Sequence, residues 1–244
     1  MTAVILFVFG AIIGSFLNVL ALRASSGLGL TGRSHCLHCA QTLGVWELIP
    51  IFSFFFLRGR CRMCRTRLSW QYPLVELWAG LIFISVPLTF LPAFCLYVAI
   101  TIYDFRHKII PDRLVYWSIL LALISRLMSD GSTLDWLAGP ILFLFLATIW
   151  LLSRGRAIGF GDAKLALSVG LLLGATAGFS ATILSFWLGA AVGILILLSQ
   201  QANPLLSGTK RITMKSEIPF APFIVLGAWL AVAFQLDLFH VSFF

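Results

Sequence analysis

The chain has 244 residues, of which 60% are hydrophobic and 11% are charged, with a mean hydropathy of +1.02 and a formal net charge of +8. A soluble globular domain carries about 25% charged residues, so this composition excludes that class and indicates a polytopic membrane protein. The positive charge does not indicate a nucleic-acid partner, because no basic and aromatic binding pattern accompanies it. We expect the basic loops to face anionic lipid instead.

The first apolar segment covers residues 2–22 and is long enough to cross a bilayer. No basic region precedes it, and it ends at Arg23 without a small-residue cleavage site. We therefore interpret it as a retained span and not as a secretory signal. This gives three predicted parts: a first transmembrane helix over 1–22, a loop module over 23–72 and a membrane core over 73–244.

The loop module contains two Cys-x2-Cys pairs. Each pair makes a tight turn that aims two sulfurs at one point, so four thiolates can close a tetrahedral structural zinc site. The predicted ligands are Cys36, Cys39, Cys61 and Cys64. His35 or His38 could replace one sulfur. Disulfides are the alternative, but they need an oxidising compartment. Because so short and basic a loop buries little core, we expect zinc to fold it without taking part in catalysis.

Seven further apolar segments follow, separated by turn signals such as Pro87, Pro92 and Pro111. The predicted spans are 73–90, 92–105, 114–128, 134–152, 164–177, 179–199 and 218–236. The fold class is thus an all-α polytopic membrane protein with about eight transmembrane helices and a small zinc-binding cytoplasmic loop module after helix 1.

The distribution of lysine and arginine predicts the orientation. If the N-terminus lies outside, every basic residue except Arg126 falls on the inner side, Lys210, Arg211 and Lys215 included. Asp130, Asp135 and Asp237 then fall on the outer side. We therefore expect the loop module at the cytoplasmic face.

Two aspartates carry the strongest functional signal. Asp104 closes an apolar run before a basic turn, and Asp162 lies in Gly159-Phe160-Gly161-Asp162-Ala163-Lys164. A carboxylate near hydrocarbon costs about 2.5 to 3.5 kcal/mol, so such acids are candidates for function. Asp162 could merely cap a helix, but Gly159 and Gly161 permit backbone conformations that other residues avoid, which suits a turn that presents one side chain. Two aspartates that meet can share one proton, as acid and base of an aspartic protease.

The other acidic residues are less specific. Asp112 follows Pro111 and precedes an apolar segment, so we favour an N-terminal cap over direct catalysis. Glu47 is expected to be solvated or a cap, whereas Glu76, just inside the second span, suggests a function. Lys164 should point to a different helix face from Asp162 and bind substrate or lipid.

Together these features resemble bacterial type IV prepilin peptidases over nearly the whole chain. The matching motifs are Asp104 with Ile110-Pro111-Asp112, the glycine-flanked Asp162, the four cysteines, Gly14-Ser15-Phe16-Leu17-Asn18, Glu47-Leu48-Ile49-Pro50, Arg58-Gly59-Arg60-Cys61 and Tyr72-Pro73-Leu74-Val75-Glu76. The resemblance implies a GxGD-type intramembrane aspartic protease of the bacterial inner membrane, with Asp104 and Asp162 as its catalytic pair. It would remove the short basic leader of type IV prepilins or type II secretion pseudopilins at the cytoplasmic face. Supporting residues are Gly159, Gly161, Lys164, Asp112 and Glu76.

A basic leader should be repelled by a chain of net charge +8, so either Glu47, Glu76 or Asp112 makes a local acidic contact with it or the substrate arrives laterally through anionic lipid. Of these, we hypothesise a role for Glu76. The resemblance also implies methylation of the new amino terminus with S-adenosylmethionine, for which the sequence has no nucleotide-binding fingerprint. The alternative is a zinc-regulated transporter with Asp104 and Asp162 as ion ligands. Acids at helix ends and the lack of an inverted repeat disfavour it. A structural secretion subunit would leave both aspartates without a role, and no oligomeric state is predicted.

Overall fold

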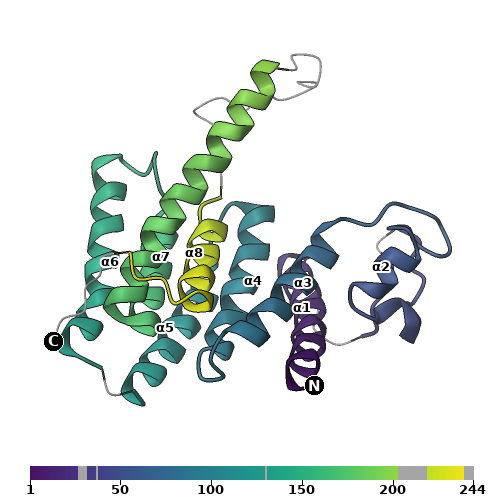
Figure 1. The fold of residues 1–244 in the computed structure, drawn as a ribbon. Coiled ribbons are helices and arrows are strands. Elements are labelled where there is room, and N and C mark those ends of the chain that lie inside the picture. Colours follow the sequence, from purple (N-terminus) through teal and green to yellow (C-terminus); the bar gives the residue numbers. More distant parts are fainter. Residues whose placement is uncertain (27–31, 37, 130, 203–218, 239–244) are drawn as a thin grey trace. The chain divides into compact units, whose positions relative to one another are not determined.

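The computed structural model describes residues 1–26, 32–36, 38–129, 131–202 and 219–238 (Figure 1). These residues form helices without any β-strand, which confirms the all-α class; two isolated bridges lie in the loop module. Four charged residues used to predict the orientation, Asp130, Lys210, Arg211 and Lys215, lie outside the described residues. The chain divides into two compact units, Met1–Tyr103 and Asp104–Phe244. The three predicted parts stay a prediction.

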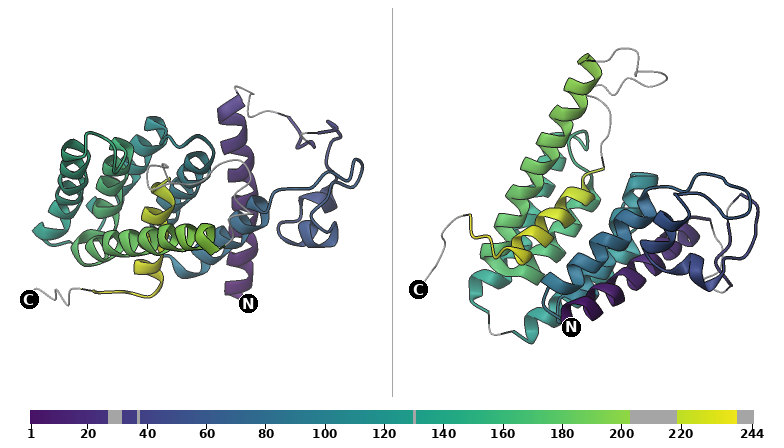
Figure 2. Two further views of the ribbon diagram at one scale, coloured as in Figure 1. Left: turned by 90° about the horizontal axis from the view of Figure 1, so that it is seen from above. Right: turned by 45° about the vertical axis from the view of Figure 1, so that its right-hand side comes forward.

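The first unit contains helices on either side of the loop module. Helix α1 (Thr2–Ser26) and helix α3 (Gln71–Ser85) pack side by side (Figure 2). The module holds the 3-10 helix η1 (Val45–Leu48) and the short helix α2 (Phe52–Phe56). Pro87 follows the end of α3, where a proline cannot continue the helix, and α4 (Leu91–His107) then begins.

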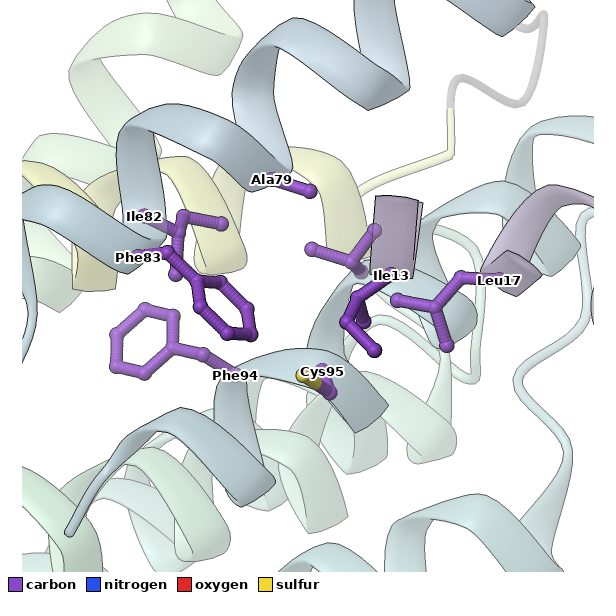
Figure 3. Close-up of a pocket in the computed structure, with 8 residues that line it drawn as sticks. Ile13, Leu17, Ala79, Ile82, Phe83, Phe94 and Cys95 are labelled. Atoms are coloured by element: carbon purple, nitrogen blue, oxygen red, sulfur yellow. The ribbon is translucent and has the colours of Figure 1, made fainter. Parts of the chain in front are cut away.

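An apolar hollow lies where α1, α3 and α4 meet (Figure 3). Its lining consists of Ile13 and Leu17 from α1, Ala79, Ile82 and Phe83 from α3, and Phe94, Cys95 and Val98 from α4. Because these side chains are apolar, the hollow belongs to the packing of the first unit and provides no group that would bind a charged ligand.

The second unit is arranged around one long helix. Helix α7 (Phe160–Ala202) packs against α5 (Asp112–Leu127), α6 (Thr133–Leu152) and α8 (Ala221–Ala233), as the green and yellow ribbons of Figure 1 show for α7 and α8. Helix α6 begins with a capping box, in which Ser132 and Asp135 bond each other's backbone N–H groups. The last turn of α4, with Asp104, belongs to this unit.

Among the residues that the structure describes, three segments are long and apolar enough to cross a membrane, namely Thr2–Ala21, Thr133–Leu152 and Phe160–Ser199, and Ala221–Ala233 is a shorter apolar helix. The count of eight spans therefore stays a prediction. The spans 164–177 and 179–199 were predicted to be separated at residue 178, and this position was wrong. The helix continues through residue 178 and is interrupted instead at Gly174, where φ is 79° and ψ is −170°. Contacts with α5 and α6, described below, determine this position.

Candidate active site and metal centre

The four predicted zinc ligands come together in the loop module. The Sγ atoms of Cys36, Cys39, Cys61 and Cys64 all lie within 4.8 Å of one another, and all four cysteines are free thiols. The Sγ atoms of Cys36 and Cys64 are 3.8 Å apart. Two Zn–S bonds of about 2.3 Å at a tetrahedral angle place their sulfurs about 3.8 Å apart. The cluster thus has the ligand type and spacing that a tetrahedral metal ion such as zinc requires.

The two Cys-x2-Cys turns have the same backbone structure. In the first, the N–H of Cys36 donates to Gln41 O and the N–H of Ala40 donates to Cys36 O. In the second, Cys61 donates to Thr66 O and Arg65 donates to Cys61 O. The residues after the second cysteines, Ala40 and Arg65, have φ values of 56° and 55°. This repeated turn directs two sulfurs from each segment to one point.

Two thiols of the cluster, those of Cys36 and Cys64, are biased toward the thiolate form that binds metals, whereas the pKa of the Cys39 thiol is raised to about 11. Hydrogen bonding with Thr66 lowers the pKa of the Cys64 thiol to about 6. Backbone N–H groups of Cys39 and His38 lower the pKa of Cys36. The neighbouring histidines do not belong to the cluster; the Nδ1 atom of His35 lies 3.4 Å from Arg33 O.

The two glutamates of the first unit both bond the backbone. Glu47 accepts a hydrogen bond from Gly44 N–H at 2.7 Å, so the expectation of a cap is confirmed. Glu76 has only 6% of its surface exposed, and its Oε2 atom accepts from Ile51 N–H at 2.6 Å. Its carboxylate also bonds Ser15. Ile51 has a φ of 63°, which is unfavourable for a β-branched residue, so Glu76 holds a strained turn of the module against α1 and α3.

The second unit brings Asp104 and Asp162 together from different helices. Asp104 is in the last turn of α4 and Asp162 is in the first turn of α7, with exposed fractions of 4% and 6%. The two carboxyl groups interact electrostatically. Within the described part of the chain, Asp104 Oδ2 and Asp162 Oδ1 are buried and have no hydrogen-bond partner. A buried carboxylate oxygen without a partner is costly, so it is a feature of sites that bind another group.

The other oxygen of each carboxyl group is held by a helix start. Asp162 Oδ2 accepts from Gly159 N–H at 3.0 Å, so the capping role weighed for Asp162 is present but uses a single oxygen. Asp104 accepts from the backbone N–H of Ala221, the first residue of α8. No local sequence pattern predicted this contact, although Pro219 and Pro222 mark the start of a helix. In each carboxyl group, one oxygen thus fixes the orientation through a hydrogen bond to the backbone, and the other oxygen has no hydrogen-bond partner among the described residues.

Gly159 and Gly161 were predicted to provide backbone conformations that other residues avoid, and this reason was wrong. Neither Gly159 nor Gly161 is among the residues with positive φ. Gly161 is instead required by space, because a Cβ atom there would lie 2.9 Å from the Cβ of Ile110. The turn before α5 therefore packs directly against the start of α7, and Gly159 provides the N–H group that Asp162 accepts.

Asp112 and Lys164 form an ion pair, with Lys164 Nζ 2.7 Å from Asp112 Oδ1. The predicted capping role of Asp112 was wrong: Pro111 is the N-cap of α5, and Asp112 is the first helical residue, without a side-chain cap bond. A carboxylate at this position can turn outward to a cation because it need not bond its own helix. Lys164 does point away from Asp162, as expected, and lies 5.4 Å from the ring of Tyr116 and 5.2 Å from that of Phe160.

Comparison with known proteins gives two family matches. Residues 8–90 match the bacterial peptidase A24 N-terminal domain, and residues 89–194 match the type IV leader peptidase family. The second range contains Asp104 and Asp162. No solved structure matches the chain.

Several curated bacterial proteins are similar along nearly their whole length, and each is named prepilin leader peptidase/N-methyltransferase. That of Bacillus subtilis (strain 168) is 33% identical over 241 residues, covering 93% of this chain and 92% of the relative. Those of Pseudomonas putida and Aeromonas hydrophila are 29% and 28% identical, covering 92% and 93% of this chain and 88% and 89% of the relatives. With the apolar helices, these relatives indicate a protein of the bacterial inner membrane. The chain belongs to the type IV leader peptidase family and is an enzyme of that family.

Proposed function

We propose that the chain is an intramembrane aspartic endopeptidase that removes the leader peptide of type IV prepilins or type II secretion pseudopilins. Asp104 and Asp162 are its catalytic carboxyl groups. The observation that carries this proposal is the pairing of two buried carboxyl groups from α4 and α7, each with one oxygen bonded to backbone and one without a partner. Asp112, Lys164 and Gly161 support the site by joining the turn before α5 to the start of α7.

The open oxygens define the chemistry. Two carboxyl groups so close cannot both ionise, so the pair shares one proton, with one group as base and the other as acid. A water molecule held between Asp104 Oδ2 and Asp162 Oδ1 loses a proton to the ionised group and attacks the peptide carbonyl carbon. The protonated group gives its proton to the carbonyl oxygen. When the C–N bond breaks, the proton taken from water is passed to the leaving amine, and one hydroxyl proton of the intermediate returns to the carboxylate that had acted as acid, which gives the carboxylic acid product and restores the shared proton.

The proposal includes an orientation in the membrane, with the N-terminus outside and the loop module and both aspartates at the cytoplasmic face. Asp104 lies in the last turn of α4, which a short turn joins to α5, and Asp162 lies in the first turn of α7, which a short segment joins to the end of α6. The basic residues of these turns are Arg106, Lys108, Arg113, Arg154 and Arg156. Such a basic end favours the cytoplasmic side and contact with anionic lipid. A substrate cut there would be cleaved at the membrane boundary.

We further propose zinc as the metal of the cysteine cluster, where it would stabilise the fold of the loop module. We also propose methylation of the new amino terminus with S-adenosylmethionine, which is supported by the N-methyltransferase activity for which the relatives are named. The apolar hollow of Figure 3 does not fit that donor, because it offers no partner for the donor's charged groups. The comparisons give no support to the transporter alternative.

The test is cleavage of a prepilin-type peptide by the purified full chain in lipid nanodiscs, followed by mass spectrometry with S-adenosylmethionine present. Asp104→Asn and Asp162→Asn should each abolish cleavage in folded protein, because either change removes one member of the acid and base pair. Asp237→Asn, a neutralised exposed aspartate, is the matched control and should cut like wild type. A product heavier by one methyl group would support methyl transfer. Cleavage by both active-site variants would refute the catalytic assignment.

A further inference from the structure

Helix α7 is broken at Gly174, and two charged side chains from neighbouring helices bond the exposed backbone on the two sides of the break. Arg126, near the end of α5, donates from Nε to Leu171 O at 3.0 Å and from Nη2 to Leu172 O at 3.3 Å. Asp135, in the first turn of α6, accepts from Ala175 N–H through Oδ1 at 2.8 Å. The break thus receives a cation on one side and an anion on the other.

This arrangement satisfies what a broken helix lacks. A helix that ends leaves carbonyl groups without partners and a partial negative charge, and one that begins leaves free N–H groups and a partial positive charge. Arg126 supplies donors to the carbonyl groups before the break, and Asp135 supplies an acceptor to the N–H after it. The two side chains also attract one another. The break is therefore a specific structural feature with its own partners.

No residue with a side chain fits at position 174. Its φ of 79° lies in the region that only glycine adopts freely. A Cβ atom there would also lie 2.5 Å from Asp135 Oδ1 and 2.9 Å from Arg126 Nη2. The glycine, the arginine and the aspartate form one unit, which we call the α7 brace.

The brace accounts for the exception in the distribution of basic residues. Arg126 is the single basic residue that the predicted orientation places outside, and it has only 7% of its surface exposed. Its guanidinium group bonds the carbonyl groups of α7, so it is a packing residue that joins α5 to α7. Asp135 joins α6 to the same point while its Oδ2 atom caps α6 at Ser132.

The part of α7 before the break, Phe160–Leu173, carries Asp162 in its first turn. At a rise of 1.5 Å per residue, the brace lies about 18 Å along this segment from Asp162. Gly161 against Ile110 and Lys164 against Asp112 hold the near end, and the brace holds the far end. A straight segment held at both ends has a defined axis and register.

We propose that Arg126 and Asp135 are positioning residues of the peptidase, which set the direction and register of Phe160–Leu173 so that Asp162 faces Asp104. The inference rests on the proposed function. It predicts that loss of the brace lowers turnover more than substrate binding, because a small displacement of one carboxyl group disturbs the reacting geometry.

The test compares Arg126→Gln, Asp135→Asn, Gly174→Ala and the double variant Arg126→Gln/Asp135→Asn with wild type, in the full chain in nanodiscs. Arg113→Gln, the same change at an exposed arginine of α5, is the matched control. For each protein, kcat and KM on a prepilin-type peptide are measured together with the thermal unfolding midpoint and the folded fraction. Asp135→Asn leaves the buried Arg126 without its anion, so its unfolding midpoint should fall the most. Arg126→Gln leaves the half-buried Asp135, which still bonds Ser132 and Ala175, so its midpoint should fall less. The double variant removes both charges and should regain part of that stability.

The expected result is a kcat about 10²-fold below wild type in the double variant, with KM near wild type and a high folded fraction. Wild-type kcat in the folded double variant, or activity losses that only follow the folded fraction, would overturn the inference and leave the proposed function intact. Failure of wild type to cut any leader peptide would refute the proposed function, and the inference would fall with it.

Discussion

Lys164 pairs with Asp112 across 2.7 Å and not with Asp162, although Asp162 is only two residues away in the chain. The pair links the first residue of α5 to the first turn of α7, so that, within the part of the chain that the structure describes, the amine of Lys164 bonds Asp112 and not Asp162. Because a cation bonded to Asp162 would favour its ionised form, we expect this arrangement to leave a shared proton available to the proposed catalytic pair.

The ion pair should contribute to activity more than to stability. The side chains of Lys164 and Asp112 are 19% and 59% exposed, and a pair of this kind contributes about 0 to 1 kcal/mol. We expect Lys164→Met and Asp112→Asn each to lower kcat/KM by up to about fivefold, and the double variant to be no worse than either single variant. A double-mutant cycle on kcat/KM at two salt concentrations measures this coupling. Additive losses would show that the two residues act separately.

Space at Gly161 should be essential for catalysis. In Gly161→Ala, the new Cβ atom would meet Ile110 at 2.9 Å and push the start of α7 away from the turn before α5. We expect a loss of about 10²-fold in kcat, although alanine by itself favours a helix. Ile110→Gly removes the Cβ atom that the new methyl group would meet, and should restore part of the activity in the double variant. Gly193→Ala is the matched control, because a Cβ atom there meets nothing within 4 Å; equal losses at both glycines would contradict the steric explanation.

The cysteine cluster should bind one metal ion and stabilise the loop module. We expect Cys36→Ser and Cys61→Ser to lose most bound zinc, measured by inductively coupled plasma mass spectrometry against about one zinc per chain in wild type. Limited proteolysis within residues 32–70 should become faster at the same time, because metal binding supplies folding energy to a small module. Cys95→Ser removes a thiol outside the cluster and should retain the metal. Unchanged zinc content in the cluster variants would exclude this site.

Glu76 should act on the loop module and not on leader charge. In Glu76→Ala, the half-buried N–H of Ile51 loses its acceptor, which costs about 1 kcal/mol of folding free energy. Glu76→Gln keeps an acceptor oxygen and should cost less. Thermal unfolding of both variants measures the difference, and Glu47→Gln, at the cap of η1, is the comparison. A changed preference for leaders of different charge in folded Glu76→Gln would instead support the contact with the basic leader that the sequence suggested.

Much of the fold and of the candidate site could be predicted from local patterns. Composition predicted an all-α membrane chain, the Cys-x2-Cys spacing predicted the four-sulfur cluster, and acids at the ends of apolar runs singled out Asp104 and Asp162. The helical class and the sulfur cluster are confirmed, and the structure brings the two aspartates together, while their catalytic role stays a prediction. Each of these predictions depends on residues that are neighbours in the chain or on the cost of burying a charge. The capping role of Asp112 failed for the opposite reason, since its partner Lys164 is remote in sequence.

By itself, the sequence determined which segments are apolar helices, which four sulfurs can gather and which two carboxyl groups lie at the ends of apolar segments, where burying a charge costs free energy. Only the tertiary structure decided that α7 breaks at Gly174, that Lys164 bonds Asp112 and that one oxygen of each aspartate stays open. A break in α7 costs little folding free energy only because Arg126 and Asp135, from other helices, bond the backbone groups that the break exposes. Partners that meet only after the helices have packed leave no local pattern in the chain.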